Sequence, residues 1–218
     1  MKYEKVIELA KSQLKDAEGG HDWFHVQRVL HNAIEIGSKE EVDMDVVAIA
    51  AILHDIADAK FHNGDENIGP KLATQIMNEC DIDQSISDHV VKIIQHISFK
   101  NSLSQSTWTS KELEVVQDAD RLEALGAVGI ARAFTYGGYK GFPLFDPNFP
   151  PEENLTKEQY KNSKAPTINH FYEKLLKLKD LMNTSSGRQM AVKRHQFLLI
   201  FLDEFYSEVG VIPEWHRS

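Results

Sequence analysis

Hydrophobic residues recur at helical spacing along most of the chain, and one run is unbroken. Residues 46–53 are all apolar and are preceded by Asp43 and Asp45. A run of this length is typical of a helix buried on most sides, or of a strand. Its alanines and the two aspartates, as candidate N-caps, favour the helix. We therefore predict a buried helix that continues to about Asp58.

The end of this run carries polar side chains. His54 and Asp55 follow the apolar residues directly, and Asp58 comes three positions later. On a helix, His54 and Asp55 would lie about 100° apart, and Asp58 would return to the same side. Buried polar groups without partners are costly, so these side chains require one. A metal ion is a suitable partner.

The remaining pattern predicts further helices and one long loop. The helices are expected over residues 3–15, 21–36, 66–80, 83–98, 110–136, 167–183 and 188–209. Residues 137–166 contain five of the seven prolines, three glycines and several aromatic residues, which are expected to pack. No stretch predicts a strand. The expected class is all-α, a helical bundle with extra C-terminal helices and one long loop rich in proline, glycine and aromatic residues.

Size, charge and cysteine content limit the functional classes. A length of 218 residues fits a single domain, with a core at about 18–135, the loop 137–166 and a C-terminal extension at 167–210. The net charge of -9 argues against a nucleic-acid partner. No signal peptide or membrane-spanning run is evident, and Cys80 stands alone, so we expect a cytoplasmic protein with no membrane partner.

Four side chains could bind one divalent ion: His25, His54, Asp55 and Asp120. Imidazole nitrogens and carboxylate oxygens together suit Mn, Fe, Ni, Co or Zn, and suit Mg less well. Other interpretations remain open at this point. His54 and Asp55 could form a hydrogen-bonded pair at a helix end, His25 could be a core histidine, and Asp118 competes with Asp120 as the carboxylate ligand.

Three ordered segments resemble a known family. They read HDWFHVQRV at 21–29, AAILHDIAD at 50–58 and DADRLEALGAVGIAR at 118–132. Together they match the H…HD…D signature of the HD-domain metal-dependent phosphohydrolases. The chain is similar to small bacterial single-domain members, and the closing segments at 166–184 and around Arg194 and His195 also look similar to that subgroup.

The resemblance implies a mechanism and a set of site residues. It implies that His25, His54, Asp55 and Asp120 bind the metal and that Asp58 accepts a proton from the attacking water. Asp58 could alternatively be a helix-end carboxylate without a catalytic role. The predicted substrate contacts are Arg28, His96, Lys100, Arg121 and His21. The implied reaction is hydrolysis of a phosphoester or phosphoanhydride in a small phosphorylated molecule, most simply a nucleotide, with Mn as a suitable metal.

Two other functions compete with this interpretation. A non-catalytic nucleotide sensor would keep the metal site and bind nucleotide without turnover. A cyclic-nucleotide phosphodiesterase would need ligands for a second metal ion, and His62, His89 and His96 do not match a dinuclear pattern cleanly. The remaining histidines are expected to have structural roles: His31, His170, His195 and His216. The sequence does not determine the oligomeric state.

Overall fold

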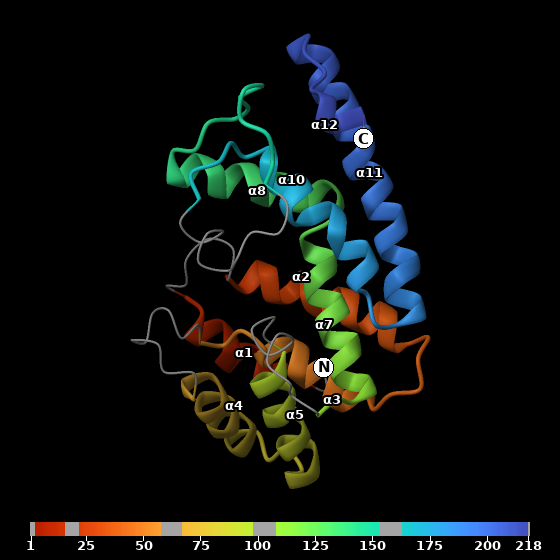
Figure 1. The fold of residues 1–218 in the computed structure, drawn as a ribbon. Helices are drawn as coiled ribbons and strands as arrows, with labels where there is room; N and C mark the ends of the chain where they lie inside the picture. The colour runs from red at the N-terminus through yellow and green to blue at the C-terminus, as the bar shows by residue number, and fades with distance from the viewer. Residues whose placement is uncertain (1–2, 16–21, 58–66, 98–107, 153–162, 218) are drawn as a thin grey trace. The chain divides into compact units, whose positions relative to one another are not determined.

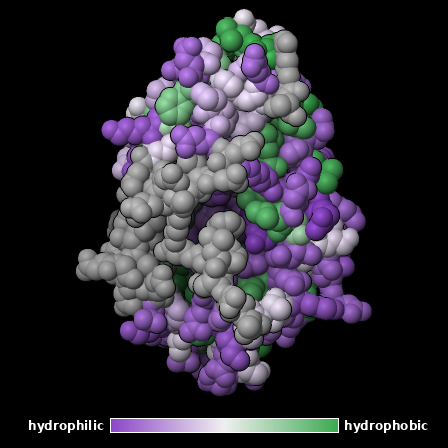
Figure 2. Space-filling view, viewed as in Figure 1, coloured by the Kyte–Doolittle hydropathy of each residue, from purple (hydrophilic) through white to green (hydrophobic). Residues whose placement is uncertain are grey.

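The computed structural model describes residues 3–15, 22–57, 67–97, 108–152 and 163–217, and all regular secondary structure in these residues is helical (Figure 1). This confirms the predicted all-α class. The chain divides into two compact units, residues 1–120 and residues 121–218. None of the helices in the described ranges is long and apolar enough to cross a membrane. On the face drawn in Figure 2, hydrophilic residues surround smaller hydrophobic patches.

The first unit is built around the apolar run. Its helices are α1 (Glu4–Gln13), α2 (Trp23–Gly37), α3 (Met44–Leu53), α4 (Ile68–Glu79), α5 (Gln84–His96) and α7 (Lys111–Glu123), whose last three residues belong to the second unit. Helix α3 packs against α1, α2 and α5, and all of residues 46–53 are buried. Helix α3 therefore forms the centre of this core. Each of its buried valine, isoleucine and leucine side chains stabilises the folded state by roughly 1.5–3 kcal/mol.

The helix starts of this unit follow the capping prediction. Asp43 accepts hydrogen bonds from the backbone N–H groups of Asp45 and Val46 at the start of α3, at 2.9 and 3.3 Å. Asp83 caps α5 in the same way through Ser85. Asp45, the other candidate cap, instead accepts a hydrogen bond from the Tyr3 hydroxyl at 2.6 Å. Asp43 is therefore confirmed as the cap of α3.

The second unit is assembled on a long C-terminal helix. Its elements are α8 (Gly126–Lys140), α10 (Asn169–Glu173), the 3-10 helix η2 (Leu175–Leu181), α11 (Ser185–Val209) and α12 (Glu214–Arg217). Helix α11 packs against α8 and η2, and α10 packs against η2. Aromatic rings of α8, α10 and α11 gather at centroid distances of 5.6–5.9 Å, with Phe171 stacked on Phe201 and both beside Phe134. Phe171 is fully buried and belongs to the core of this unit, together with Leu198 and Leu202 of α11.

Several predicted boundaries were wrong. The buried helix ends at Leu53 rather than near Asp58. The predicted helix 110–136 is two helices, because Leu125 is extended and Gly126 has a φ of +69°, a backbone conformation that glycine adopts without a steric penalty. Arg132 of α8 pairs with the buried Glu123 across this corner. Helix α8 then runs to Lys140, so the irregular segment begins later than predicted.

The C-terminal elements also differ from the prediction in detail. The predicted helix 167–183 is the short α10 followed by η2, and α11 begins at Ser185 with Thr184 as its N-cap. Gly210 ends α11 in the left-handed conformation, which glycine adopts readily at a helix C-terminus. The aromatic side chains of the predicted loop segment 137–166, whose first residues belong to α8, pack only in part. Phe145 contacts the rings of Phe205 and Tyr206, whereas Tyr139 is 72% exposed.

His170 on α10 gives the stability of the protein a specific pH dependence. Burial, and secondarily the charge of Lys174, lowers the pKa of His170 from 6.5 to about 4. Between these pH values the unfolded chain binds a proton that the folded chain does not, so the free energy of unfolding falls as the pH falls. Between pH 7 and pH 5, we expect the free energy of unfolding of the wild type to fall by about 2 kcal/mol more than that of His170→Gln.

Urea denaturation of both proteins at the two pH values measures this difference. Carboxylates that titrate in the same range contribute equally to both proteins and cancel. Equal losses of stability in wild type and His170→Gln would show that His170 is not the residue responsible.

Candidate metal centre

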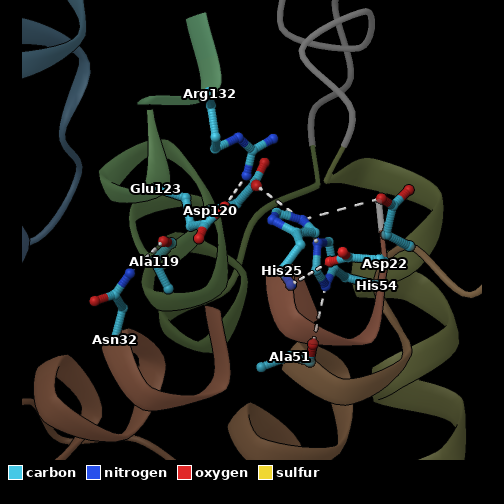
Figure 3. Close-up of polar contacts among 10 residues, drawn as sticks. Asp22, His25, Asn32, Ala51, His54, Ala119, Asp120, Glu123 and Arg132 are labelled. Atoms are coloured by element: carbon cyan, nitrogen blue, oxygen red, sulfur yellow. Dashed lines mark hydrogen bonds and ion pairs between the residues drawn. The ribbon is translucent and has the colours of Figure 1, made fainter. Parts of the chain in front are cut away.

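His25 is placed by the first turn of α2. Asp22 is the N-cap of this helix, and its side chain accepts a hydrogen bond from the backbone N–H of His25 at 2.9 Å (Figure 3). The imidazole is buried, with 2% of its side chain exposed. The apolar face of α2 therefore carries one polar ring toward the interior of the first unit.

His54 and Asp55 lie just beyond the end of α3. His54 is the C-cap of the helix, and its Nδ1 lies 2.9 Å from the carbonyl oxygen of Ala51. A carbonyl can only accept, so Nδ1 carries a proton, and in the neutral imidazole Nε2 then holds a lone pair. A backbone carbonyl commonly orients metal-binding histidines in this way. The turn thus prepares Nε2 of His54 to bind a cation.

Asp120 is contributed by α7, at a distant point in the sequence. Asn32 of α2 donates a hydrogen bond from Nδ2 to the carbonyl oxygen of Ala119 at 3.1 Å, and both residues are buried. This bond fixes α7 against α2 one residue before Asp120. Asp118, the alternative carboxylate, is fully buried and is not part of the group described next.

The ligand atoms of His25, His54 and Asp120 lie within 4.8 Å of one another and could hold a metal ion. Nε2 of His25 is 3.3 Å from Nε2 of His54 and 3.6 Å from Oδ1 of Asp120 (Figure 3). Asp55 lies beside this group, with Oδ2 at 4.0 Å from the same His25 nitrogen. The carboxylate distances exceed the usual hydrogen-bond range of about 2.7–3.2 Å.

The spacing and the chemistry of these side chains both fit a divalent cation. Ligands at about 2.1 Å from one ion are separated by roughly 3.0–3.4 Å when they are neighbours and by about 4.2 Å when they lie opposite each other. The His25–His54 distance of 3.3 Å falls in the first range, and the carboxylate distances of 3.6 and 4.0 Å lie between the two values. Two neutral imidazoles and two carboxylates carry a charge of about -2, which a divalent ion balances. Asp120 keeps 46% of its side chain exposed, so the group is accessible from solvent. The structure therefore contains a candidate metal site in the first unit.

The predicted substrate contacts have mixed outcomes. Arg28 lies one turn after His25 on α2 and is half-buried. His96 is near the end of α5, where its Nδ1 lies 2.7 Å from the Lys92 carbonyl and its ring is 5.0 Å from that of Trp108. Arg121 donates a hydrogen bond to the carbonyl of Leu181 at 2.6 Å, an engagement that the sequence did not indicate. Their roles as phosphate contacts remain predictions.

Three predicted site residues lie outside the described residues: Asp58, His21 and Lys100. His62, one of the histidines considered for a second metal ion, also lies outside them. His89 is described, and its Nε2 lies 2.9 Å from the Ser110 hydroxyl. Within the described ranges, the group that could hold a metal contains neither His89 nor His96.

Comparison with known proteins identifies the class of protein. The family model of the HD domain matches residues 23–125, which include all four predicted ligands. An HD-superfamily hydrolase from Bacillus thuringiensis is 40% identical, with a TM-score of 0.77 over 97% of this chain and 98% of the other. The chain belongs to the HD-domain family.

A second relative is known with a bound nucleotide. Bacillus subtilis YpgQ is 36% identical over 208 residues, which are 94% of this chain and 93% of YpgQ. The crystal structure of YpgQ in complex with ADP matches with a TM-score of 0.75 and 33% identity, covering 98% of this chain and 96% of the other.

Three positioning groups were missed in the sequence: the Asp22 cap, the Ala51 carbonyl and the Asn32 amide. Asp22 had a recognisable signal, because an aspartate directly before an amphipathic helix is a common N-cap. The role of the Ala51 carbonyl could not be predicted, because it depends on where α3 ends. The contact of Asn32 with Ala119 spans 87 positions, which no local pattern reveals.

Proposed function

We propose that this protein is a metal-dependent phosphohydrolase that cleaves a phosphoester or phosphoanhydride bond of a nucleotide. The observation that carries the proposal is the grouping of His25, His54 and Asp120 within 4.8 Å. Asp55, at 4.0 Å from His25, is the fourth proposed ligand. The HD-domain match and the ADP complex of YpgQ support a phosphorylated substrate.

Hydrogen bonds hold two of the proposed ligands in position. His54 presents Nε2 because its Nδ1 is committed to the Ala51 carbonyl, and His25 is held by the capped first turn of α2. Imidazole and carboxylate donors suit Mn, Fe, Ni, Co or Zn better than Mg. A bound divalent ion supplies Lewis-acid chemistry, lowering the pKa of water and polarising a phosphoryl oxygen.

The remaining steps are assigned to side chains of the chain. Asp58 accepts the proton of the attacking water. The oxygen of this water bonds to phosphorus while the phosphorus–oxygen bond to the leaving group breaks. Arg28, His96, Lys100 and Arg121 neutralise the phosphate oxygens, and His21 supports them. Release of phosphate would make the protein a nucleotidase, and release of pyrophosphate a nucleotide pyrophosphohydrolase.

A matrix of metals and nucleotides tests this function. The purified protein is treated with EDTA, supplied in turn with Mn, Fe, Ni, Co, Zn or Mg, and given mono-, di- and triphosphates. Phosphate and pyrophosphate are separated as products. We expect EDTA to abolish hydrolysis, Mn to restore it, and elemental analysis to find one metal per chain.

Three results would go against the proposal. Hydrolysis that EDTA leaves unchanged would contradict the metal mechanism. Tight nucleotide binding without turnover for any metal would favour a sensor. Two metal equivalents per chain would favour a phosphodiesterase with a dinuclear site.

A further inference from the structure

A polar groove in the second unit lies between η2 and α11. It has a volume of about 340 Å³, within the range of pockets that hold small molecules. Lys179 and Asp180 of η2 line one side, and Arg188, His195 and Gln196 of α11 line the other. Positions 188, 192, 195 and 199 of α11 share one helix face, which explains how residues over three turns reach one groove.

The charges in the groove are predominantly positive. Lys179 and Arg188 are permanent cations, and the single carboxylate is that of Asp180. Asp180 does not neutralise Lys179 effectively, because its side chain is 74% exposed and the Oδ1–Nζ distance is 3.9 Å. Exposed pairs at such distances interact weakly. In a chain with a net charge of -9, this groove is suited to an anion.

His195 lines the groove with a ring that is only partly buried. Its Nδ1 is buried and has no hydrogen-bond partner in the part of the chain that the structure describes. Burial, and secondarily the charge of Lys179, lowers the pKa of its ring, so the imidazole is neutral near pH 7. Since Nδ1 is not accessible from solvent, a ligand in the groove would contact the exposed part of the ring.

Arg188 is held in position for recognition of an oxyanion. Its Nη2 donates a hydrogen bond to the carbonyl of Met182 at 2.9 Å, directly after η2. This bond fixes a guanidinium whose planar array of donors matches phosphate oxygens. Gln196 adds an amide donor, and Val192 and Leu199 add apolar surface.

We propose that this groove binds phosphate, as the inorganic ion or as the phosphate group of a small organic molecule, through Lys179, Arg188 and His195. The site shares no residue with the candidate metal centre and does not depend on the proposed reaction. Lys179 supplies charge, Arg188 supplies guanidinium donors held in place by the Met182 carbonyl, and the exposed part of the His195 ring contacts the ligand. The volume exceeds the needs of a single phosphate ion and leaves room for an organic group beside Val192.

The test uses a signal that reports on the groove itself. The ring ¹⁵N resonances of His195, assigned by their absence in His195→Gln, are followed in the full-length chain. Inorganic phosphate, pyrophosphate and adenosine monophosphate are added separately at constant ionic strength, with sodium chloride as the reference. The titrations contain EDTA, so that no probe binds through a metal ion at the candidate metal centre.

We expect saturable movement of the His195 resonances with at least one phosphate probe and none with chloride. Movement with inorganic phosphate identifies an ion site, and movement with the nucleotide alone identifies an organic ligand. Lys179→Met is expected to weaken binding about tenfold, since hydrogen bonds between charged groups are the stronger ones. The matched control, Lys177→Met, changes an exposed lysine of η2 that does not line the groove and should alter binding less than twofold.

Two outcomes overturn the proposal. One is the absence of saturable movement of the wild-type His195 resonances at millimolar concentrations of all three probes. The other is equal binding by wild type and a folded Lys179→Met protein. If Lys179→Met does not fold, the wild-type titration alone decides between binding and its absence.

Discussion

Replacing His25 with glutamine is expected to release the metal ion and to lower kcat/KM by about 10³-fold or more. Nε2 of His25 lies 3.3 Å from Nε2 of His54, 4.0 Å from Oδ2 of Asp55 and 3.6 Å from Oδ1 of Asp120. It is therefore close to all three other proposed ligands. Loss of Lewis-acid stabilisation worth several kcal/mol corresponds to at least this factor in rate. Metal content and nucleotide hydrolysis are measured on the same preparation.

The substitution and its control are matched in position. His25→Gln keeps the hydrogen bond from Asp22, because that bond involves the backbone N–H of residue 25. His31→Gln changes an exposed histidine on the same helix, and it should retain full metal content and activity. A folded His25→Gln protein with one bound metal and normal turnover would remove His25 from the proposed ligand set.

Replacing Asp58 with asparagine is expected to lower kcat by about 10²–10⁴-fold while the metal stays bound. A positioned general base contributes about this factor, and asparagine cannot accept the proton. The test separates the roles of the carboxylates, because loss of a ligand removes the metal and loss of the base does not. Activity, metal content and KM are measured together.

The control for Asp58 is Asp88→Asn, which neutralises an exposed carboxylate on α5 and should leave kcat unchanged. If Asp58→Asn keeps its full kcat, Asp58 has no catalytic role. Another group would then have to accept the proton of the attacking water.

The parts of the fold that were predictable depend on local patterns. The apolar run 46–53 identified α3, and Asp43 identified its start, because capping involves residues two or three positions apart. Helical period and turn residues likewise gave the all-α class. The break at Gly126 was missed because the apolar spacing continues on both sides of it, and a single glycine does not reveal its φ angle.

The candidate site was predictable in its chemistry but not in its geometry. Residue types and order indicated His25, His54 and Asp120, which the structure brings together. The prediction placed His54 and Asp55 on a helix, whereas the helix ends before them and a turn carries both. The hydrogen bond from Arg121 to the carbonyl of Leu181 joins residues 60 positions apart, so a local pattern cannot reveal it.

The most direct test of the account is a crystal structure of the protein grown with Mn²⁺, with anomalous scattering recorded for that metal. The account predicts one peak per chain, with Nε2 of His25, Nε2 of His54 and carboxylate oxygens of Asp55 and Asp120 at about 2.0–2.2 Å. A peak bound by other residues, or a map without a peak between these four side chains, would contradict it.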